Sequence, residues 1–306
     1  MARIAVLVPC YNEEPTIASV VRGFRDAIPE AAVYVFDNNS RDATVRVARD
    51  AGAEVRHVAA QGKGHVVRRM FADVEADVYV LVDGDDTYDA ASAPGLVSRL
   101  LEGHLDMVVA GRTGAEADAY RRGHRLGNRA FTAFVAWLFG RGFSDLFSGY
   151  RAFSRRFVKS FPALATGFEI ETELTVHALE LRMPVDEMPT PYRARPEGSE
   201  SKLRTYRDGY RILRTIVRLF QRGRPFAFFG WLSVVLAAAS VGLAVPLFFT
   251  YLETGLVPRL PTAILASAIM LVAVLSMVCG IILDTVTLGR QEMKRLAYLN
   301  IDSRLP

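Results

Sequence analysis

Residues 78–86 read VYVLVDGDD, an apolar run that passes directly into acid. An uninterrupted run of five valine, tyrosine and leucine residues predicts a buried β-strand. Asp83, Asp85 and Asp86 follow within four positions. We therefore expect a sheet in which this strand ends in carboxylates, and we expect those carboxylates to be exposed, with little role in packing.

Strand-like and helical patterns alternate around this run. Such alternation predicts a mainly parallel sheet with helices on both faces. In sheets of this kind, ligands bind beyond the carboxyl ends of the strands. The predicted strands are residues 3–8, 32–37, 53–58, 78–83 and 106–111, and the predicted helices are residues 15–27, 43–51, 63–73 and 90–103.

Polar motifs follow these predicted strands at the points where they end. Their convergence on one edge of the sheet indicates a polar, phosphorylated ligand. The motifs are PCYNEE (9–14), DNNS (37–40), QGKG (61–64), DGDD (83–86) and GR (111–112).

Asp83 and Asp85 are alternate residues, so on an extended chain both carboxylates face the same way. Hard divalent cations such as Mg²⁺ and Mn²⁺ take one or two carboxylates and complete their shell with substrate phosphates. An Asp-x-Asp pair alone is also typical of acidic turns and helix caps, and Asp86 and Thr87 fit such caps. The polar motifs at the ends of the neighbouring strands favour the metal-binding interpretation of this pair.

Two segments lack Asp, Glu, Lys and Arg altogether, residues 227–252 and 262–283. Each exceeds the roughly 20 residues that a helix needs to cross a bilayer, and aromatic residues flank the first. A pair of buried helices in a soluble protein is the alternative. Basic residues precede the first segment and follow the second, whereas the connecting loop has only Arg259. This bias predicts a hairpin in the cytoplasmic membrane with the N-terminal domain and both termini in the cytosol.

Residues 203–222 have an amphipathic helical pattern in which tyrosine, leucine and phenylalanine share a face beside a row of arginines. A helix in the membrane interface fits this pattern, and a solvent-exposed helix packed on the domain is the alternative. Residues 121–139 also have a helical pattern, and residues 189–202 read as a loop. The predicted organisation is a domain over 1–202, a juxtamembrane helix over 203–224, two transmembrane helices over 225–285 and a cytosolic tail over 286–306.

The net charge of +4 suits anionic lipid or a phosphorylated ligand as well as nucleic acid, but no nucleic-acid motif is visible. The first residues do not form a signal peptide, because their apolar run is short. Cys10 and Cys279 are not expected to form a disulfide, and the five histidines lack metal-ligand spacing.

Six motifs in combination resemble glycosyltransferase family 2, and within it the polyprenyl-phosphate sugar synthases, the group of dolichol-phosphate mannose synthase. The resemblance covers about residues 3–225. It implies a GT-A (Rossmann-like) α/β fold, inversion at the anomeric carbon, a nucleotide sugar donor and a divalent metal. The motifs are VPCYNEEPTI, DNNSRDAT, GKG, DGDD, SGYRAFSR and SKL.

The resemblance also implies roles for individual residues. Asp83 and Asp85 would hold Mg²⁺ or Mn²⁺ against the diphosphate and so act in catalysis. Thr87 stands where the family often has glutamine, which leaves a third protein ligand open. The implied nucleotide-binding residues are Pro9, Tyr11, Asn12, Glu13, Asp37, Asn39, Gly62, Lys63, Gly64 and Asp83, and the implied acceptor-phosphate residues are Arg112, Arg125, Arg129, Arg195, Ser201 and Lys202.

Simpler interpretations remain for several of these residues. Lys63 could be a plain surface lysine, because GKG is not a P-loop. Arg125 and Arg129 could lie on a solvated helix face. Glu169, Glu171 and Glu173 could include one ligand of a sugar hydroxyl, while the others stabilise a helix start.

The sequence therefore predicts an inverting membrane enzyme that moves a sugar from a UDP- or GDP-linked donor to a polyprenyl phosphate, as a possible homo-oligomer. A transferase acting on a sugar hydroxyl is the alternative, but that chemistry wants a general base. Residues 221–226, QRGRPF, also lack the Gln-x-x-Arg-Trp motif of processive members. A membrane-anchored scaffold without activity is a further alternative, which the intact Asp-x-Asp pair disfavours.

Overall fold

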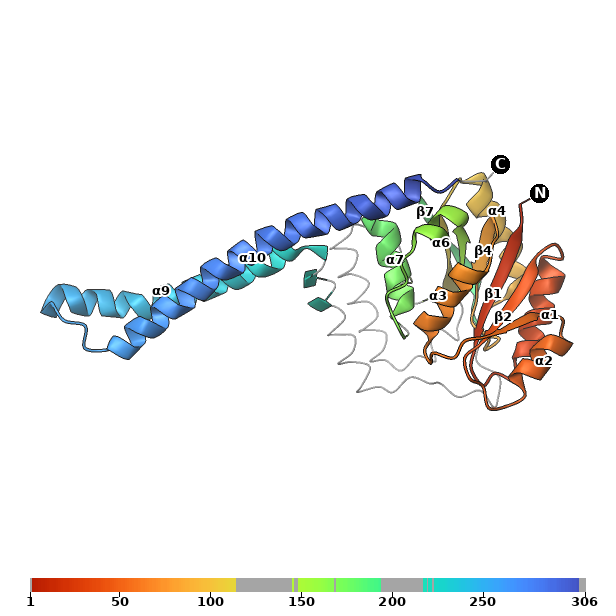
Figure 1. Cartoon of the computed structure of the whole chain (residues 1–306), viewed down its shortest axis with the longest axis horizontal. Coiled ribbons are helices and arrows are strands. Elements are labelled where there is room, and N and C mark those ends of the chain that lie inside the picture. Colours follow the sequence, from red (N-terminus) through yellow and green to blue (C-terminus); the bar gives the residue numbers. More distant parts are fainter. Residues whose placement is uncertain are drawn as a thin grey trace. The chain divides into compact units, whose positions relative to one another are not determined.

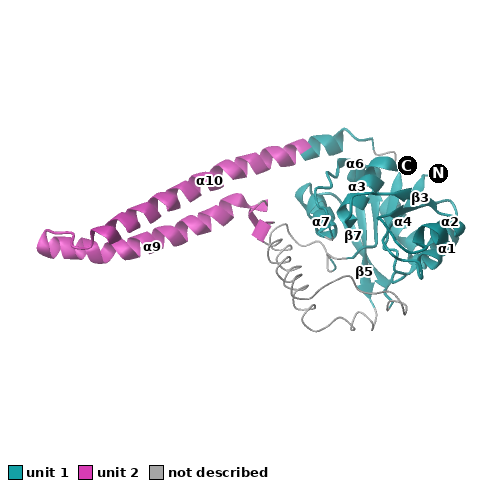
Figure 2. Cartoon of the chain, turned by 60° about the horizontal axis from the view of Figure 1, so that its bottom comes forward, with its two compact units in different colours: residues 1–208, 294–306 teal, residues 209–293 magenta. Residues whose placement is uncertain are grey.

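A computed structural model describes residues 2–113, 145, 148–167, 169–193, 217–218, 220–221 and 223–302 of the chain. The chain divides into two compact units, which Figure 2 colours separately. The first unit comprises Met1–Asp208 with Lys294–Pro306, and the second comprises Gly209–Met293.

A mixed sheet organises the first unit (Figure 1). Its strands within the described residues run in the order β3-β2-β1-β4-β6-β5-β7. All neighbouring pairs are parallel except those of β6, which is antiparallel to both β4 and β5. The strands are β1 (Ile4–Cys10), β2 (Ala32–Asp37), β3 (Glu54–His57), β4 (Val78–Leu81), β5 (Met107–Thr113), β6 (Arg151–Ser154) and β7 (Val185–Pro191).

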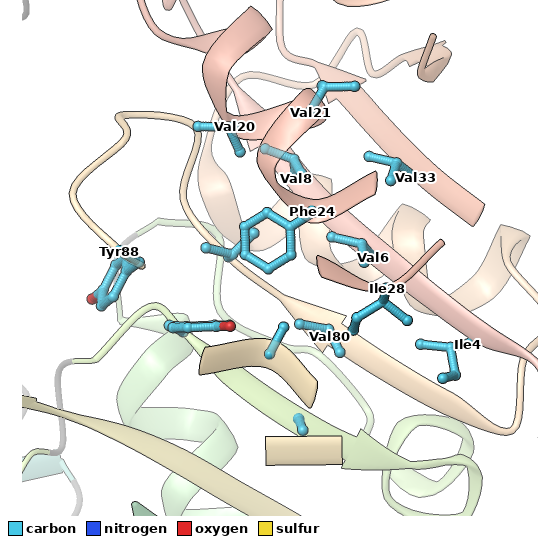
Figure 3. Close-up of a cluster of buried hydrophobic side chains, with 14 of the residues drawn as sticks. Ile4, Val6, Val8, Val20, Val21, Phe24, Ile28, Val33, Val80 and Tyr88 are labelled. Carbon is cyan, nitrogen blue, oxygen red and sulfur yellow. The ribbon is translucent and has the colours of Figure 1, made fainter. Parts of the chain in front are cut away.

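Two apolar clusters cover the two faces of this sheet, because alternate strand residues point to opposite sides. Val6 and Val8 of β1 belong to one cluster, whereas Ala5 and Leu7 belong to the other. Figure 3 shows the first cluster, with Phe24 at its centre. Helices α1 (Ile17–Ala27), α2 (Thr44–Asp50) and α4 (Ala93–Glu102) contribute to the first cluster, and α3 (Lys63–Asp73), α6 (Arg155–Ser160) and α7 (Ile170–Glu180) contribute to the second.

The predicted α/β fold and its first five strands are confirmed. The predicted helix over 90–103 divides into a short 3₁₀ turn, η1 (Ala90–Ser92), and α4. Strands β6 and β7 were not predicted, and residues 189–191 of the predicted loop belong to β7. Residues 121–139 and most of 203–222 lie outside the described residues.

The second unit contains two long apolar helices, α9 (Pro225–Thr254) and α10 (Leu260–Leu299), with mean hydropathies of 2.3 and 2.6 in their most apolar windows. Both are long and apolar enough to cross a membrane. The two predicted apolar segments are therefore helical. Residues 286–299, at the start of the predicted cytosolic tail, are helical and continue α10.

The end of α10 lies within the first unit and packs against it. Lys294 forms an ion pair with Glu180 at 2.8 Å. The Tyr298 hydroxyl donates a hydrogen bond to Asp106, which precedes β5, at 2.7 Å. These contacts fix the end of α10 within the first unit.

Small residues at seven-residue intervals bring α9 and α10 together: Ala266, Ala273 and Gly280 on α10 are buried. Ser233 and Ser240 are their buried counterparts on α9, and the Ser240 hydroxyl donates to the carbonyl of Ala266 at 2.7 Å. Close approach of backbones through small residues is typical of helix pairs in membranes.

Gly280→Leu is expected to destabilise the hairpin, because a Cβ at this position would lie 3.1 Å from Cβ of Phe229. Overpacking of this kind costs about 1–3 kcal/mol. Thermal unfolding of the purified protein measures the effect. Gly242→Leu is the matched control, since a Cβ there meets nothing within 4 Å. Equal melting temperatures for the two variants would contradict the packing that we describe.

Candidate functional site

Four residues with positive φ angles lie in the loops that follow parallel strands. Asn12, Asn39 and Asp86 have positive φ angles of 52°, 68° and 56°, and Gly62 has a φ of 131°. Asparagine, aspartate and glycine adopt such angles more readily than other residues. Each of these residues belongs to a motif predicted to meet the ligand, and strained backbone is common at such sites.

The loops that follow β1 and β2 are tied together by hydrogen bonds. The Asn12 amide donates to the Ser40 hydroxyl at 2.9 Å, and the Asn12 side-chain oxygen accepts from the Arg41 amide at 2.8 Å. The Glu13 amide donates to the Thr44 hydroxyl at 2.9 Å. The sequence analysis did not single out Ser40 or Thr44, whose role depends on this tertiary contact.

The loop after β2 also fixes the start of α3. Asp37 is buried, and its carboxylate accepts from the Ser40 amide at 3.1 Å. The Asn38 side-chain oxygen accepts from the Gly62 amide at 2.7 Å, and Asn39 donates to the carbonyl of Ala59 at 3.0 Å. Sequence reasoning missed Asn38, although it lies inside the DNNS motif.

The first residue of α3, Lys63, is an interior residue. Its Nζ atom lies 2.5 Å from Asp83 Oδ1 and 2.5 Å from Glu171 Oε1. Burial opposes the charge on this ammonium, but the two carboxylates outweigh burial and raise the pKa of Lys63. Lys63 therefore remains charged, and the interpretation of a plain surface lysine is wrong.

The acidic turn follows β4 and is less exposed than the sequence predicts. Asp83 is half-buried, whereas the whole of Asp85 is only 5% exposed. Asp85 Oδ1 accepts a hydrogen bond from the Thr87 hydroxyl at 2.6 Å. The expectation that Asp85 is exposed with little packing role is therefore wrong, because Asp85 is buried and is hydrogen-bonded to Thr87.

Gly149 of the SGYR motif lies against the Asp83 carboxylate. A Cβ built on this glycine would be 2.3 Å from Asp83 Oδ2, so no other residue fits here without movement. The Gly149 amide donates to the Tyr88 hydroxyl at 2.9 Å. Because Gly149 has no side chain, the Asp83 carboxylate can lie directly against its backbone.

The carboxylates of this turn suit a hard divalent cation. Among the residues that the structure describes, no group of three or more histidine, cysteine, aspartate or glutamate side chains could hold a metal. A pair of carboxylates is nevertheless what Mg²⁺ or Mn²⁺ takes from a protein when substrate phosphates complete the coordination shell. The donor set therefore fits the predicted cation. Thr87 is engaged with Asp85, and the structure does not identify a third ligand.

Arg112 lies at the end of β5 in a paired arrangement. Its Nε and Nη2 atoms donate to the two carboxylate oxygens of Asp145 at 2.7 and 2.9 Å. Its guanidinium also lies over the ring of Tyr192, 5.4 Å from the centroid. The planar fork that binds this carboxylate is the same group that binds a phosphate.

The end of β7 reaches the acidic turn. The Arg193 amide donates to the Thr87 carbonyl at 2.9 Å, and its guanidinium donates to Asp89 at 3.2 Å. Arg193 thus lies beside this turn. The predicted acceptor residues Arg195, Ser201 and Lys202 lie outside the described part of the chain, as do Arg125 and Arg129.

The remaining predicted residues lie along the same sheet edge. Pro9, Tyr11 and Glu13 are partly exposed at the end of β1, and Gly64 is buried in the first turn of α3. Glu173 accepts hydrogen bonds from the amides of Leu164 and Ala165 at 3.0 and 2.7 Å, so it stabilises the loop before α7.

Comparison with known proteins agrees with this arrangement. Residues 5–161 match the family model described as glycosyl transferase family 2. Glycosyltransferase AglJ of Haloferax volcanii is 33% identical over 299 residues, which cover 97% of this chain and 98% of AglJ. A dolichyl-phosphate hexose transferase of the same organism is 30% identical over 217 residues, covering 71% of this chain and 93% of that protein.

A solved structure shares the fold. Glucosyl-3-phosphoglycerate synthase from Mycobacterium tuberculosis, crystallised with Mn²⁺ and UDP-glucose, superposes with a TM-score of 0.59 at 24% identity. The match covers 72% of this chain and 79% of the synthase.

Proposed function

Because the chain belongs to glycosyl transferase family 2, we propose that it moves a sugar from a nucleoside diphosphate to a polyprenyl phosphate at a membrane. The observation that carries this proposal is the Asp83–Asp85 turn beside Lys63, at the sheet edge where the motif loops meet. The relative named as a dolichyl-phosphate hexose transferase supports the acceptor class.

The donor lies along the ends of β1, β2 and β4 in this proposal. Asp83 and Asp85 would hold Mg²⁺ or Mn²⁺, and this cation would neutralise negative charge on the leaving diphosphate. The loops after β1 and β2 and the start of α3, which are joined by hydrogen bonds, form the wall of the nucleotide site in this proposal. The residues of that wall are Pro9, Tyr11, Asn12, Glu13, Asp37, Asn39, Gly62, Lys63 and Gly64.

A phosphate acceptor requires no strong base, because it is already anionic. This suits Glu171, whose carboxylate is ion-paired with Lys63 rather than presented as a base. A hydroxyl acceptor, the alternative, would need a group that removes a proton. Inversion follows from a single displacement in which the acceptor oxygen attacks opposite the leaving diphosphate.

The acceptor phosphate is bound by cations in this proposal. Arg112 offers a bidentate fork at the end of β5. Arg195 and Lys202, which follow Arg193 in the sequence, are proposed as further cations. The proposed acceptor residues are Arg112, Arg125, Arg129, Arg195, Ser201 and Lys202.

The proposal includes a membrane location, with the catalytic unit and both termini in the cytosol, and the two apolar helices support the membrane association. Basic residues precede the first apolar segment and follow the second, whereas the connecting loop has only Arg259. This distribution supports the proposed topology. Labelling of cysteines introduced in residues 253–259 by an impermeant reagent added outside the cell checks it. Labelling only after permeabilisation would contradict the hairpin.

A panel assay tests the proposed reaction. Membranes containing the protein are incubated with UDP- and GDP-sugars and with undecaprenyl or dolichyl phosphate, and products are identified by mass. We expect a polyprenyl-phosphate sugar that disappears with EDTA and returns with Mg²⁺ or Mn²⁺. A product formed only on a sugar hydroxyl would support the alternative transferase instead.

A further inference from the structure

Three charged side chains from three different elements meet at the Lys63 ammonium. Lys63 begins α3, Glu171 lies in the first turn of α7, and Asp83 follows β4. The side chains of Glu171 and Lys63 are only 8% and 10% exposed, whereas that of Asp83 is 29% exposed. Asp83 is thus the end of the group that faces the site, and Glu171 is the buried end.

The buried ion pair between Lys63 and Glu171 remains electrostatically favourable without Asp83. Arg151 is fully buried and donates to the Thr175 hydroxyl at 2.8 Å, and Thr175 in turn donates to the Glu171 carbonyl at 3.1 Å. The Glu171 carboxylate also acts electrostatically on the Arg151 guanidinium. Lys63 can therefore stay paired with Glu171 whether or not Asp83 is engaged elsewhere.

We propose that Glu171 is a positioning residue of the donor site, which holds Lys63 when Asp83 releases it to a divalent cation. The inference rests on the proposed function, in which Asp83 binds that cation. Lys63 and the cation compete for the same carboxylate. Glu171 eases the competition because the lysine it retains does not become a buried charge without a partner, which would be costly.

This arrangement makes a specific forecast for metal affinity. In Glu171→Gln, Lys63 depends on Asp83 alone, so a cation must leave a buried ammonium unpaired and should bind about tenfold more weakly. In Lys63→Met the competitor is gone, so the cation should bind at least as tightly as in the wild type. In the double variant Glu171 has no lysine to hold, so its affinity should equal that of Lys63→Met.

The experiment titrates the purified full-length chain with Mn²⁺ alone and follows free Mn²⁺ by electron paramagnetic resonance. Glu75→Gln is the matched control, because Glu75 forms an ion pair with Lys159 at 2.7 Å on the surface. Thermal unfolding of each variant monitors folding. The double variant keeps the test valid if a single variant is unstable, since removing both partners leaves no uncompensated charge between them.

Two outcomes would overturn this inference and leave the proposed function standing. If Glu171→Gln weakens Mn²⁺ binding equally with and without Lys63, Glu171 acts by its charge through space. If both single variants weaken binding and melt earlier, and the double variant does not recover, the role is structural. Asp83→Asn tests the proposed function separately from the inference. If Asp83→Asn binds Mn²⁺ as tightly as the wild type, Asp83 is not a ligand, and the inference about Glu171 fails as well.

Discussion

Replacing Asp85 with asparagine is expected to lower sugar transfer at least about 100-fold, or about 2.7 kcal/mol of activation free energy. Asparagine keeps the volume of the side chain but removes the anionic oxygen that a hard cation requires. The measurement is transfer to polyprenyl phosphate at saturating Mg²⁺ or Mn²⁺. Asp50→Asn makes the same charge change at an exposed position and should leave transfer unchanged.

The burial of Asp85 makes a second control necessary. Its carboxylate accepts from the Thr87 hydroxyl, so a change at Asp85 also disturbs the turn. Thr87→Val removes this hydrogen bond and keeps both carboxylates, and we expect it to lose much less activity than Asp85→Asn. Near-normal turnover of Asp85→Asn at saturating metal would exclude Asp85 as a ligand. Equal losses in the two variants would assign Asp85 to turn structure instead.

Local sequence pattern was sufficient for the parallel half of the sheet. Strands β1, β2, β4 and β5 each have a compact apolar run, and motifs follow at their ends because parallel strands end at one edge. β7 has no such run: its sequence VDEMPTP contains acid and two prolines, which only an edge strand tolerates. β6 is four residues long and antiparallel, so no local pattern marks it.

The site was predictable in its residue types but not in its contacts. The sequence places Lys63 and Asp83 near the ligand, yet the ion pair of Lys63 with Glu171 joins two residues that are far apart in the sequence. The prediction that Asp85 is exposed was wrong for a similar reason. An acid after a strand is usually exposed, and only the fold of the following turn buries it here.

Removing Arg112 is expected to lower the catalytic efficiency with polyprenyl phosphate by about 10- to 100-fold, or about 1.4–2.7 kcal/mol. Arg112→Ala deletes the fork proposed to hold the acceptor phosphate. Donor binding, measured by calorimetry with the nucleoside diphosphate sugar, should change little. Kinetic titration with the lipid acceptor at saturating donor measures the loss.

The partner of Arg112 distinguishes recognition of the acceptor from a structural latch. Arg112 and Asp145 form a bidentate pair whose side chains are both largely buried, so removing either partner disturbs the same contact. If the pair is only a latch, Arg112→Ala and Asp145→Ala should cause similar losses and similar shifts in melting temperature. If Arg112 binds the acceptor, Asp145→Ala leaves the guanidinium available to the phosphate and should retain most of the efficiency. Comparable losses in the two variants would therefore remove Arg112 from the acceptor site.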